Sequence, residues 1–237
     1  MTLPSVSTVT AAPSHPASAV VGSTIGGPVI SWTFRDASTR PVADADFTLK
    51  APSGGTAPPV TPFSDINGVV QAGSWTLGTT AGYQYLQLGL PDGRIFRDSI
   101  LAIPDAARRL AKVSGDSQTA AVNSQLPELL VVRVVDQYGN GVSNIAVQWS
   151  TCDGIAGEPV PPTDANGYSS TRQPTGTEPS SEPFCTMATA SVPEGSPVQF
   201  HYTVTGGAPA MSQMRATTSA RHSGPPPMAP KSGGGRP

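Results

Sequence analysis

Residues 135–149 read VDQYGNGVSNIAVQW, and residues 35–49, about 100 positions earlier, read RDASTRPVADADFTL. Both stretches have an aspartate at the second position, Asp36 and Asp136, followed by a polar turn and then by apolar residues. Apolar residues that alternate with polar ones are typical of a strand with one buried face, and turn residues mark its ends. The two stretches therefore predict the same local structure, a turn that leads into a strand.

A second pair of matching turns lies at nearly the same offset in each half of the chain. Residues 65–68 read DING and residues 164–167 read DANG. Asn-Gly tolerates positive φ and is a strong turn signal. A repeat of about 100 residues has the length of a whole domain rather than that of a solenoid unit. We therefore expect two copies of one small β module in tandem.

The composition favours strands and turns and excludes several classes of partner. Charged residues make up 13% of the 237 residues, about half of the usual ~25%. The net charge of −2 provides no field that would attract nucleic acid. No apolar run approaches the ~20 residues that a bilayer-spanning helix needs. We expect no nucleic-acid partner and no membrane span.

Short apolar segments separated by turn signals, without helical periodicity, predict an all-β chain of two tandem immunoglobulin-like β-sandwiches. We expect the first sandwich at residues 19–103 and the second at residues 107–206, joined by a short linker with limited bending. Residues 1–18 are interpreted as an N-terminal linker or a first strand. Residues 207–237, rich in Gly and Pro, are predicted to be a disordered tail. Residues 69–77 are predicted to form one continuous strand.

Both cysteines, Cys152 and Cys185, lie in the second module. An even and sparing count favours one disulfide and an oxidising compartment, and two buried free thiols in a cytosolic protein are the alternative. A bridge that closes this loop would contribute about 3.5–4 kcal/mol in the chain-entropy model. After Met1 the sequence has neither the basic stretch nor the apolar core of a signal peptide. We expect a mature or trimmed fragment, or another route out of the cell, such as a virus particle.

Several of these segments carry a family resemblance. KVSGDSQT at residues 112–119, LVVRVVDQYGNGV at 130–142 and TDANG at 163–167 resemble the bacterial Ig-like group 1 repeat of invasin- and intimin-type surface proteins. WTLGTTAG at 75–82 is similar to the strand–turn–strand that closes such repeats, and the likeness covers roughly residues 20–206. The resemblance implies an immunoglobulin-like sandwich that serves as a rigid spacer or adhesive unit outside a cell. Related modules also occur on phage structural proteins.

No residue pattern predicts catalysis, a cofactor or a metal. The chain lacks a Gly-x-Ser-x-Gly elbow and a glycine-rich phosphate loop that leads into a helix. His15 and His222 are placed in flexible ends, and His201 in a strand. A zinc site from Cys152, Cys185 and His201 is the one metal alternative that includes a histidine. We expect a protein that is not an enzyme.

Acidic and amide side chains at the turns allow two interpretations. Asp136, Asp164 and Asn166 could bind calcium, as oxygen-rich loops do. Alternatively, these Asx side chains accept hydrogen bonds from the backbone of their own turns. We favour the turn interpretation.

Aromatic residues supply the candidate ligand contacts, which are Trp75, Tyr83 and Tyr85. Exposed aromatics on a sandwich can stack on sugars or anchor a protein partner. Tyr83 and Tyr85 share one strand face because residues two apart in a strand point the same way. Core or edge packing is the alternative for both tyrosines, and Trp32 and Trp149 are expected to fill the two cores.

The function hypothesis is a non-catalytic extracellular structural or adhesive protein, a rigid tandem Ig-like spacer or surface-display module. Its partners would be other proteins or copies of itself, and its location the cell surface or a virion surface. One alternative is a virion structural or decoration protein. The other is a carbohydrate-binding module that contacts a surface glycan through the three aromatic residues.

Overall fold

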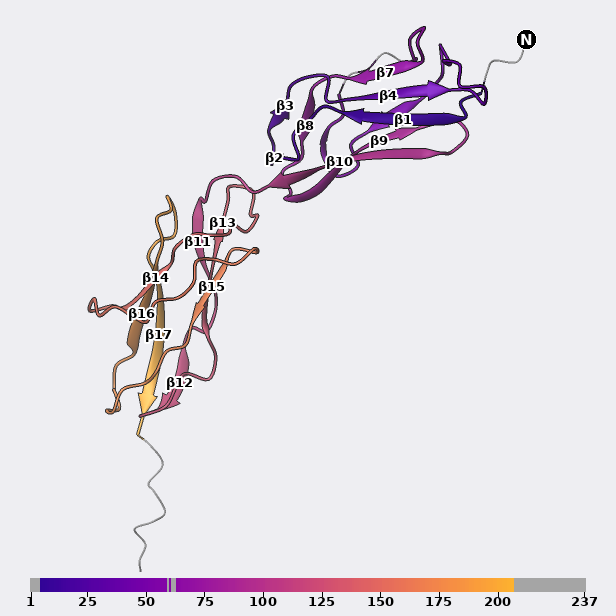
Figure 1. The fold of residues 1–237 in the computed structure, drawn as a ribbon. Coiled ribbons are helices and arrows are strands. Elements are labelled where there is room, and N and C mark those ends of the chain that lie inside the picture. The colour runs from indigo at the N-terminus through magenta and orange to yellow at the C-terminus, as the bar shows by residue number, and fades with distance from the viewer. Residues whose placement is uncertain (1–4, 59, 61–62, 207–237) are drawn as a thin grey trace, which may run out of the picture. The chain divides into compact units, whose positions relative to one another are not determined.

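The computed structural model describes residues 5–58, 60 and 63–206 (Figure 1). The regular elements in this part of the chain are all strands, so the prediction of an all-β chain is confirmed. Within the described residues there is no helix of the length and apolar character that a membrane crossing requires. The predicted tail at 207–237 lies outside the described residues.

Buried apolar side chains form two separate clusters, one in each half of the chain. The first cluster contains the fully buried Trp32, Trp75 and Phe34, and the second contains Trp149 and Phe200. Each cluster lies between the sheets of one half. We call the half that encloses the first cluster module one, and the half that encloses the second cluster module two.

Module one is a sandwich of two main sheets and one small sheet. The first main sheet has the order β1-β4-β7, with β1 at Thr8–Pro13, β4 at Ile30–Arg35 and β7 at Val69–Ala72. The second has the order β2-β10-β9-β5, with β2 at Ser18–Val20, β10 at Ile95–Ile103, β9 at Gly82–Gly89 and β5 at Thr48–Lys50. The small sheet has the order β3-β8-β6, with β3 at Thr24–Ile25, β8 at Trp75–Leu77 and β6 at Gly55–Thr56.

Module two repeats the two main sheets. The first has the order β11-β13-β15, with β11 at Arg109–Ser114, β13 at Leu130–Val135 and β15 at Tyr168–Thr171. The second has the order β12-β17-β16-β14, with β12 at Gln118–Ala121, β17 at Val198–Thr205, β16 at Phe184–Thr189 and β14 at Gln148–Thr151. In each four-stranded sheet one edge strand runs parallel to its neighbour, β2 to β10 and β12 to β17. The two modules therefore have the same topology in their main sheets.

The four turns that recur in the sequence have one hydrogen-bond pattern. In each turn the aspartate Oδ1 accepts hydrogen bonds from the backbone N–H groups two and four residues ahead, at 2.7–2.9 Å. The aspartates are Asp36, Asp65, Asp136 and Asp164. Asx side chains that bind their own backbone in this way hold the chain in a turn. The duplicated motif thus builds the same turn at equivalent places in both modules.

One expectation about module one needs correction, and one open alternative is decided. The continuous strand predicted at 69–77 is wrong, because β7 ends at Ala72 and β8 begins at Trp75, in a different sheet. Gly73 and Ser74 separate them, and glycine commonly marks a bend in a strand. Of the two alternatives for the opening residues, the structure has the strand, since β1 pairs antiparallel with β4.

The prediction that His15 belongs to a flexible end is also wrong. The imidazole is 6% exposed, and its Nε2 lies 2.5 Å from Oδ2 of Asp98 on β10. The ring also makes an edge contact with Trp75, with centroids 6.3 Å apart. This long-range pair fixes the segment between β1 and β2 on the sandwich, and a partner 83 residues away leaves no local signal in the sequence.

Hydrogen bonds connect residues on either side of the joint at about residue 105. Asn140 accepts a hydrogen bond from the Ala81 N–H at 2.9 Å and donates one to the Thr79 carbonyl at 2.9 Å. Asp136 accepts one from the Asp105 N–H at 3.0 Å. The limited bending expected of this joint stays a prediction that these contacts support.

Candidate functional site

The outward surface of β9 carries two tyrosines that the core does not use. Tyr83 is 65% exposed and Tyr85 is 37% exposed, whereas Gln84 and Leu86 between and after them are buried. The alternation follows from the two-residue period of a strand. The structure therefore places both predicted contact tyrosines on one outward face.

Buried Gln84 fixes the start of β9 and so the direction of the tyrosines. Its Oε1 accepts a hydrogen bond from the Gly78 N–H at 2.7 Å, and its Nε2 donates to the carbonyls of Gly78 and Thr80 at 3.0 and 2.9 Å. Three hydrogen bonds satisfy this amide inside the protein, and a one-residue slip of β9 would break them all and bury the tyrosines instead.

The neighbouring strands extend this apolar surface. Figure 1 shows β10 beside β9, and in their register Leu101 lies opposite Tyr83 and Ser99 opposite Tyr85. On the other side of β10, Ile103 pairs with Val20 of edge strand β2. All of these apolar side chains are 37–65% exposed. We call the set the tyrosine face, and it consists of Val20, Tyr83, Tyr85, Leu101 and Ile103.

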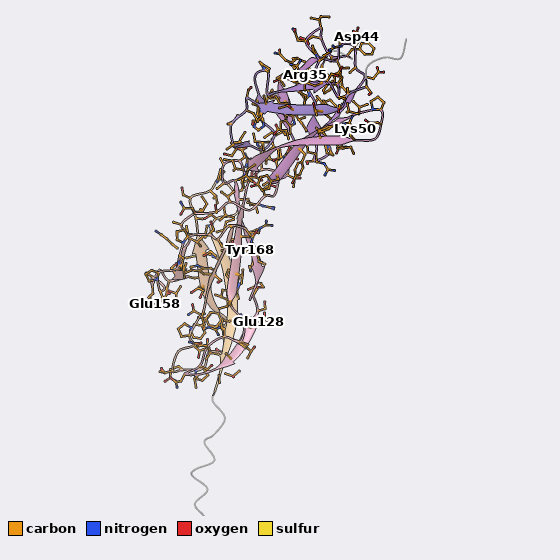
Figure 2. The ribbon with its side chains drawn as sticks, turned by 45° about the vertical axis from the view of Figure 1, so that its right-hand side comes forward. Arg35, Asp44, Lys50, Glu128, Glu158 and Tyr168 are labelled. Atoms are coloured by element: carbon orange, nitrogen blue, oxygen red, sulfur yellow. A yellow bond between two sulfur atoms is a disulfide. The ribbon has the colours of Figure 1, made fainter. Side chains whose placement is uncertain are left out.

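A row of polar and basic residues borders the tyrosine face. Lys50 of β5 (labelled in Figure 2) lies opposite Gln87 of β9, which in turn lies opposite Arg97 of β10. Lys50 and Arg97 are exposed. Neither has an ion-pair partner within residues 5–58, 60 and 63–206. We call Lys50 and Arg97 the basic row.

Trp75 does not join this surface. Its ring is 0% exposed and belongs to the first core cluster, together with Trp32. A ring without exposed surface cannot stack on a sugar, so the prediction that Trp75 contacts a ligand is corrected. Its place in β8, a strand that is not in the sheet of β9, separates it from Tyr83 and Tyr85.

The two cysteines form the disulfide Cys152–Cys185, with their Cα atoms 5.3 Å apart. The disulfide prediction is thereby confirmed. His201 lies opposite Cys185 in the register of β16 and β17, but both thiols are used in the bridge. The zinc alternative therefore lacks its thiolate ligands.

Asp136, the best candidate for a calcium ligand, is already saturated by the protein. Burial would raise the pKa of this 3% exposed carboxyl. Hydrogen bonds from the Asn140 side chain and from the N–H groups of Asp105, Asn140 and Tyr138 outweigh burial and hold the pKa below its ordinary value. Across the described parts of the chain, no three His, Cys, Asp or Glu side chains are grouped so that they could hold a metal.

Two further carboxyls have a lowered pKa for local reasons. The backbone N–H and then the side chain of Arg94 lower the pKa of Asp92. Burial raises the pKa of Asp116, but hydrogen bonds from the Lys112 ammonium and the His201 N–H outweigh burial and hold the pKa below its ordinary value. Each is a pair of neighbouring surface groups at a turn or a strand end.

The sequence reasoning missed the aliphatic residues and the basic row. A signal for part of the set exists in residues 100–103, where Ile, Leu, Ala and Ile are consecutive. In a strand, such a run has apolar side chains on both faces, so one face must be exposed or covered by a partner. The basic row has no such signal, since only the pairing of three strands places Lys50 and Arg97 in one row across the sheet.

Comparison with known proteins supports the fold. No protein-family model and no curated protein matches the sequence. Among solved structures, the Escherichia coli adhesin FdeC is 20% identical, with a TM-score of 0.53 over 88% of this chain and 67% of the other. Yersinia pseudotuberculosis InvD is 19% identical, with a TM-score of 0.55 over 87% of this chain and 59% of the other. Invasin, a bacterial integrin-binding protein, is 19% identical over 84% of this chain and 40% of the other, with a TM-score of 0.40.

These neighbours match the expected bacterial Ig-like fold, and the likeness at this level of identity concerns the fold alone. The chain spans about two thirds or less of the length of each neighbour. What those whole proteins do therefore bears on this chain only as a proposal.

Proposed function

We propose that the chain is a non-catalytic extracellular adhesive protein, in which module one contacts a partner protein and module two acts as a spacer. The observation that carries the proposal is the difference between the two equivalent four-stranded sheets. The register aligns Tyr85, Leu101 and Ile103 of module one with Cys185, Thr203 and Thr205 of module two.

The fold therefore does not require an apolar surface at this place. Module two builds the same sheet with threonines that face water, and both modules have complete cores. Exposed contiguous apolar patches on soluble proteins usually mark interaction sites. Tyrosines are favourable there because each buries a large area for little loss of side-chain freedom.

Extracellular placement is supported by the disulfide, because such bonds persist in oxidising compartments and are rare in the cytosol. The spacer role of module two rests on its polar outward strand, where Gln199, His201, Thr203 and Thr205 alternate with buried residues. The similarity to the adhesin FdeC agrees with this proposal.

Attachment of protein-coated beads to cultured epithelial cells and to matrix-coated plates tests the proposal. We expect beads carrying the wild-type chain to attach and beads carrying the Tyr83→Ser/Tyr85→Ser variant to lose most attachment. Thr203→Ala/Thr205→Ala changes the equivalent outward surface of module two, at the positions of Leu101 and Ile103, and as the control should attach like wild type. Attachment that survives the tyrosine variant but fails in the control would contradict the division of roles.

A carbohydrate ligand is the second candidate, favoured only by the pair of exposed tyrosines. The aliphatic neighbours Leu101, Ile103 and Val20 offer no hydrogen bonds to sugar hydroxyls, and Trp75 is buried. A glycan array would favour this candidate if it gave a signal that the tyrosine variant abolishes.

A further inference from the structure

The tyrosine face and the basic row form one continuous outward surface of the sheet β2-β10-β9-β5. Successive outward positions along a strand are about 7 Å apart, and adjacent strands lie ~4.8 Å apart. The basic row is therefore one step from Tyr85 and two steps from Tyr83 along β9, and the backbones of its two residues are about 10 Å apart across β9.

Acidic residues outnumber basic ones in the part of the chain that precedes residue 207. All 16 acidic residues of the chain precede residue 207, together with only ten of its 14 basic residues. Among the described residues, three of these cations form ion pairs, Arg94 with Asp92, Arg108 with Glu194 and Lys112 with Asp116. Lys50 and Arg97 are among the seven described cations, ten minus these three, that form no ion pair.

Module two again provides the comparison. Its residues at the positions of Lys50 and Arg97 are Ser150 and Gln199, which are uncharged. The fold thus does not require cations at these positions, and the basic row occurs in the module that also has the tyrosine face. The two features are arranged as an apolar centre with a charged border, as in protein–protein interfaces.

We infer that this surface binds a partner protein whose contact region has carboxylate side chains beside an apolar patch, with the carboxylates placed on the basic row. The inference rests on the proposed adhesive function and adds the chemistry of the partner. Unpaired cations on the rim of an apolar contact select partners with opposite charge and reject those with like charge. A second copy of this chain is the competing occupant, and sedimentation distinguishes it from a partner protein.

Selection from a displayed library of random 12-residue peptides on the immobilised full-length chain tests the inference. Wild type should enrich peptides that combine Asp or Glu with Leu, Ile, Phe or Trp. The charge-reversed variant Lys50→Glu/Arg97→Glu should instead enrich Lys or Arg with the same apolar residues. Ser150→Glu/Gln199→Glu, the equivalent change in module two, should select like wild type.

Titration of one enriched peptide then measures the charge contribution. Affinity should fall at least tenfold on charge reversal and should weaken between 50 mM and 500 mM salt. Enrichment without an acidic bias, equal enrichment on the charge-reversed variant, or no enrichment above the Tyr83→Ser/Tyr85→Ser variant would overturn the inference. Sedimentation that shows a dimer which the tyrosine variant dissolves would also overturn it, in favour of a second copy.

The bead assay separates the failure of this inference from the failure of the proposed function. Attachment that is lost in the tyrosine variant but unchanged in Lys50→Glu/Arg97→Glu would reject the acidic partner and leave the adhesive role standing. Attachment that neither variant changes would reject the contact role of module one itself.

Discussion

Module one and module two have the same main sheets, the same Asx turns and the same parallel edge strand, but opposite outward chemistry on the four-stranded sheet. Where module one exposes Tyr85 between Leu101 and the basic row, module two has Cys185, which the disulfide ties to Cys152. Positions that both modules share are needed for the fold. Positions at which they differ are not fixed by the fold, and in module one they include Tyr85, Leu101 and Ile103 of the tyrosine face and the basic row.

The modules also differ in how they are reinforced. Module two is closed by the disulfide Cys152–Cys185, and module one has the buried pair His15–Asp98. Both links lie on the four-stranded sheet or next to it, but only the disulfide occupies part of its outward surface. Module one therefore keeps its outward surface free for contact.

Removal of the disulfide should give the largest difference between the modules. Cys152→Ala/Cys185→Ala should lower the stability of module two by about 3.5–4 kcal/mol in the chain-entropy model, because the unfolded loop regains its freedom. Peptide-resolved hydrogen exchange reports each module separately and should show faster exchange in module two alone. An equal loss of protection in module one would mean that the modules do not unfold separately.

Substitution of equivalent glycines in the two modules should lower the stability of each module by the same amount. Gly68 and Gly167 have φ of +70° and +82°, and an added Cβ would lie 2.5 Å from the Phe34 carbonyl oxygen and 2.3 Å from that of Val134. Gly68→Ala and Gly167→Ala should each destabilise their own module by about 2–3 kcal/mol, through backbone strain and the clash. Chemical denaturation followed by hydrogen exchange measures the loss of stability in each module. A twofold or greater inequality would show that the turns are not equivalent.

The Asx turns should differ in one respect. Asp136 accepts two hydrogen bonds at Oδ2, from Asn140 Nδ2 and the Asp105 N–H, beyond the pair at Oδ1 that Asp36 also accepts. Asp136→Asn should cost about 2 kcal/mol, and Asp36→Asn under about 1 kcal/mol. Denaturant titration at neutral pH gives both values. Equal losses of stability in the two variants would show that the additional hydrogen bonds at Oδ2 of Asp136 do not stabilise the protein.

The same carboxyl makes the stability of module two depend on acid. Since the pKa of Asp136 is lower in the folded state, its contribution is complete above the unfolded value of about 4 and is lost as pH falls through the folded pKa. The difference in unfolding free energy between wild type and Asp136→Asn should therefore be larger at pH 6 than at pH 2. A difference that stays constant between these pH values would contradict the lowered pKa.

The smallest effect on stability is expected at the tyrosine face. Tyr83→Ser/Tyr85→Ser should change the unfolding free energy of module one by less than about 1 kcal/mol, because the side chains lie outside the core. Thermal denaturation checks this value. A loss of several kcal/mol would mean that the tyrosines are structural, and that the difference between the sheets reflects folding.

Much of the repeated frame could be predicted from the sequence, because its signals are local. The aspartates of the turns and the backbone N–H groups that donate to them lie within four residues of each other, and the shared face of Tyr83 and Tyr85 follows from strand periodicity alone. The parallel strands β2 and β12 left no comparable signal, since each is defined by a partner about 83 residues away.

Trp75 shows why the candidate site was only partly predicted. Its closeness in sequence to Tyr83 suggested a cluster, but the chain changes sheet between β7 and β8 and turns the indole into the core. Lys50 and Arg97 are 47 residues apart in the sequence, and only strand pairing places them in one row across the sheet. Sites assembled across strands depend on register, which a single sequence without a visible turn between the strands does not specify.

Site-specific photo-crosslinking shows whether the partner contacts the tyrosine face of module one rather than the equivalent surface of module two. Ser99 lies opposite Tyr85 and next to the tyrosine face, and His201 occupies the equivalent position in module two. A benzoylphenylalanine at either position, in the full-length chain bound to cells, captures whatever lies within a few ångströms of it. We expect protein adducts from position 99 and none above background from position 201. Adducts from position 201 alone, or equal adducts from both, would contradict this expectation.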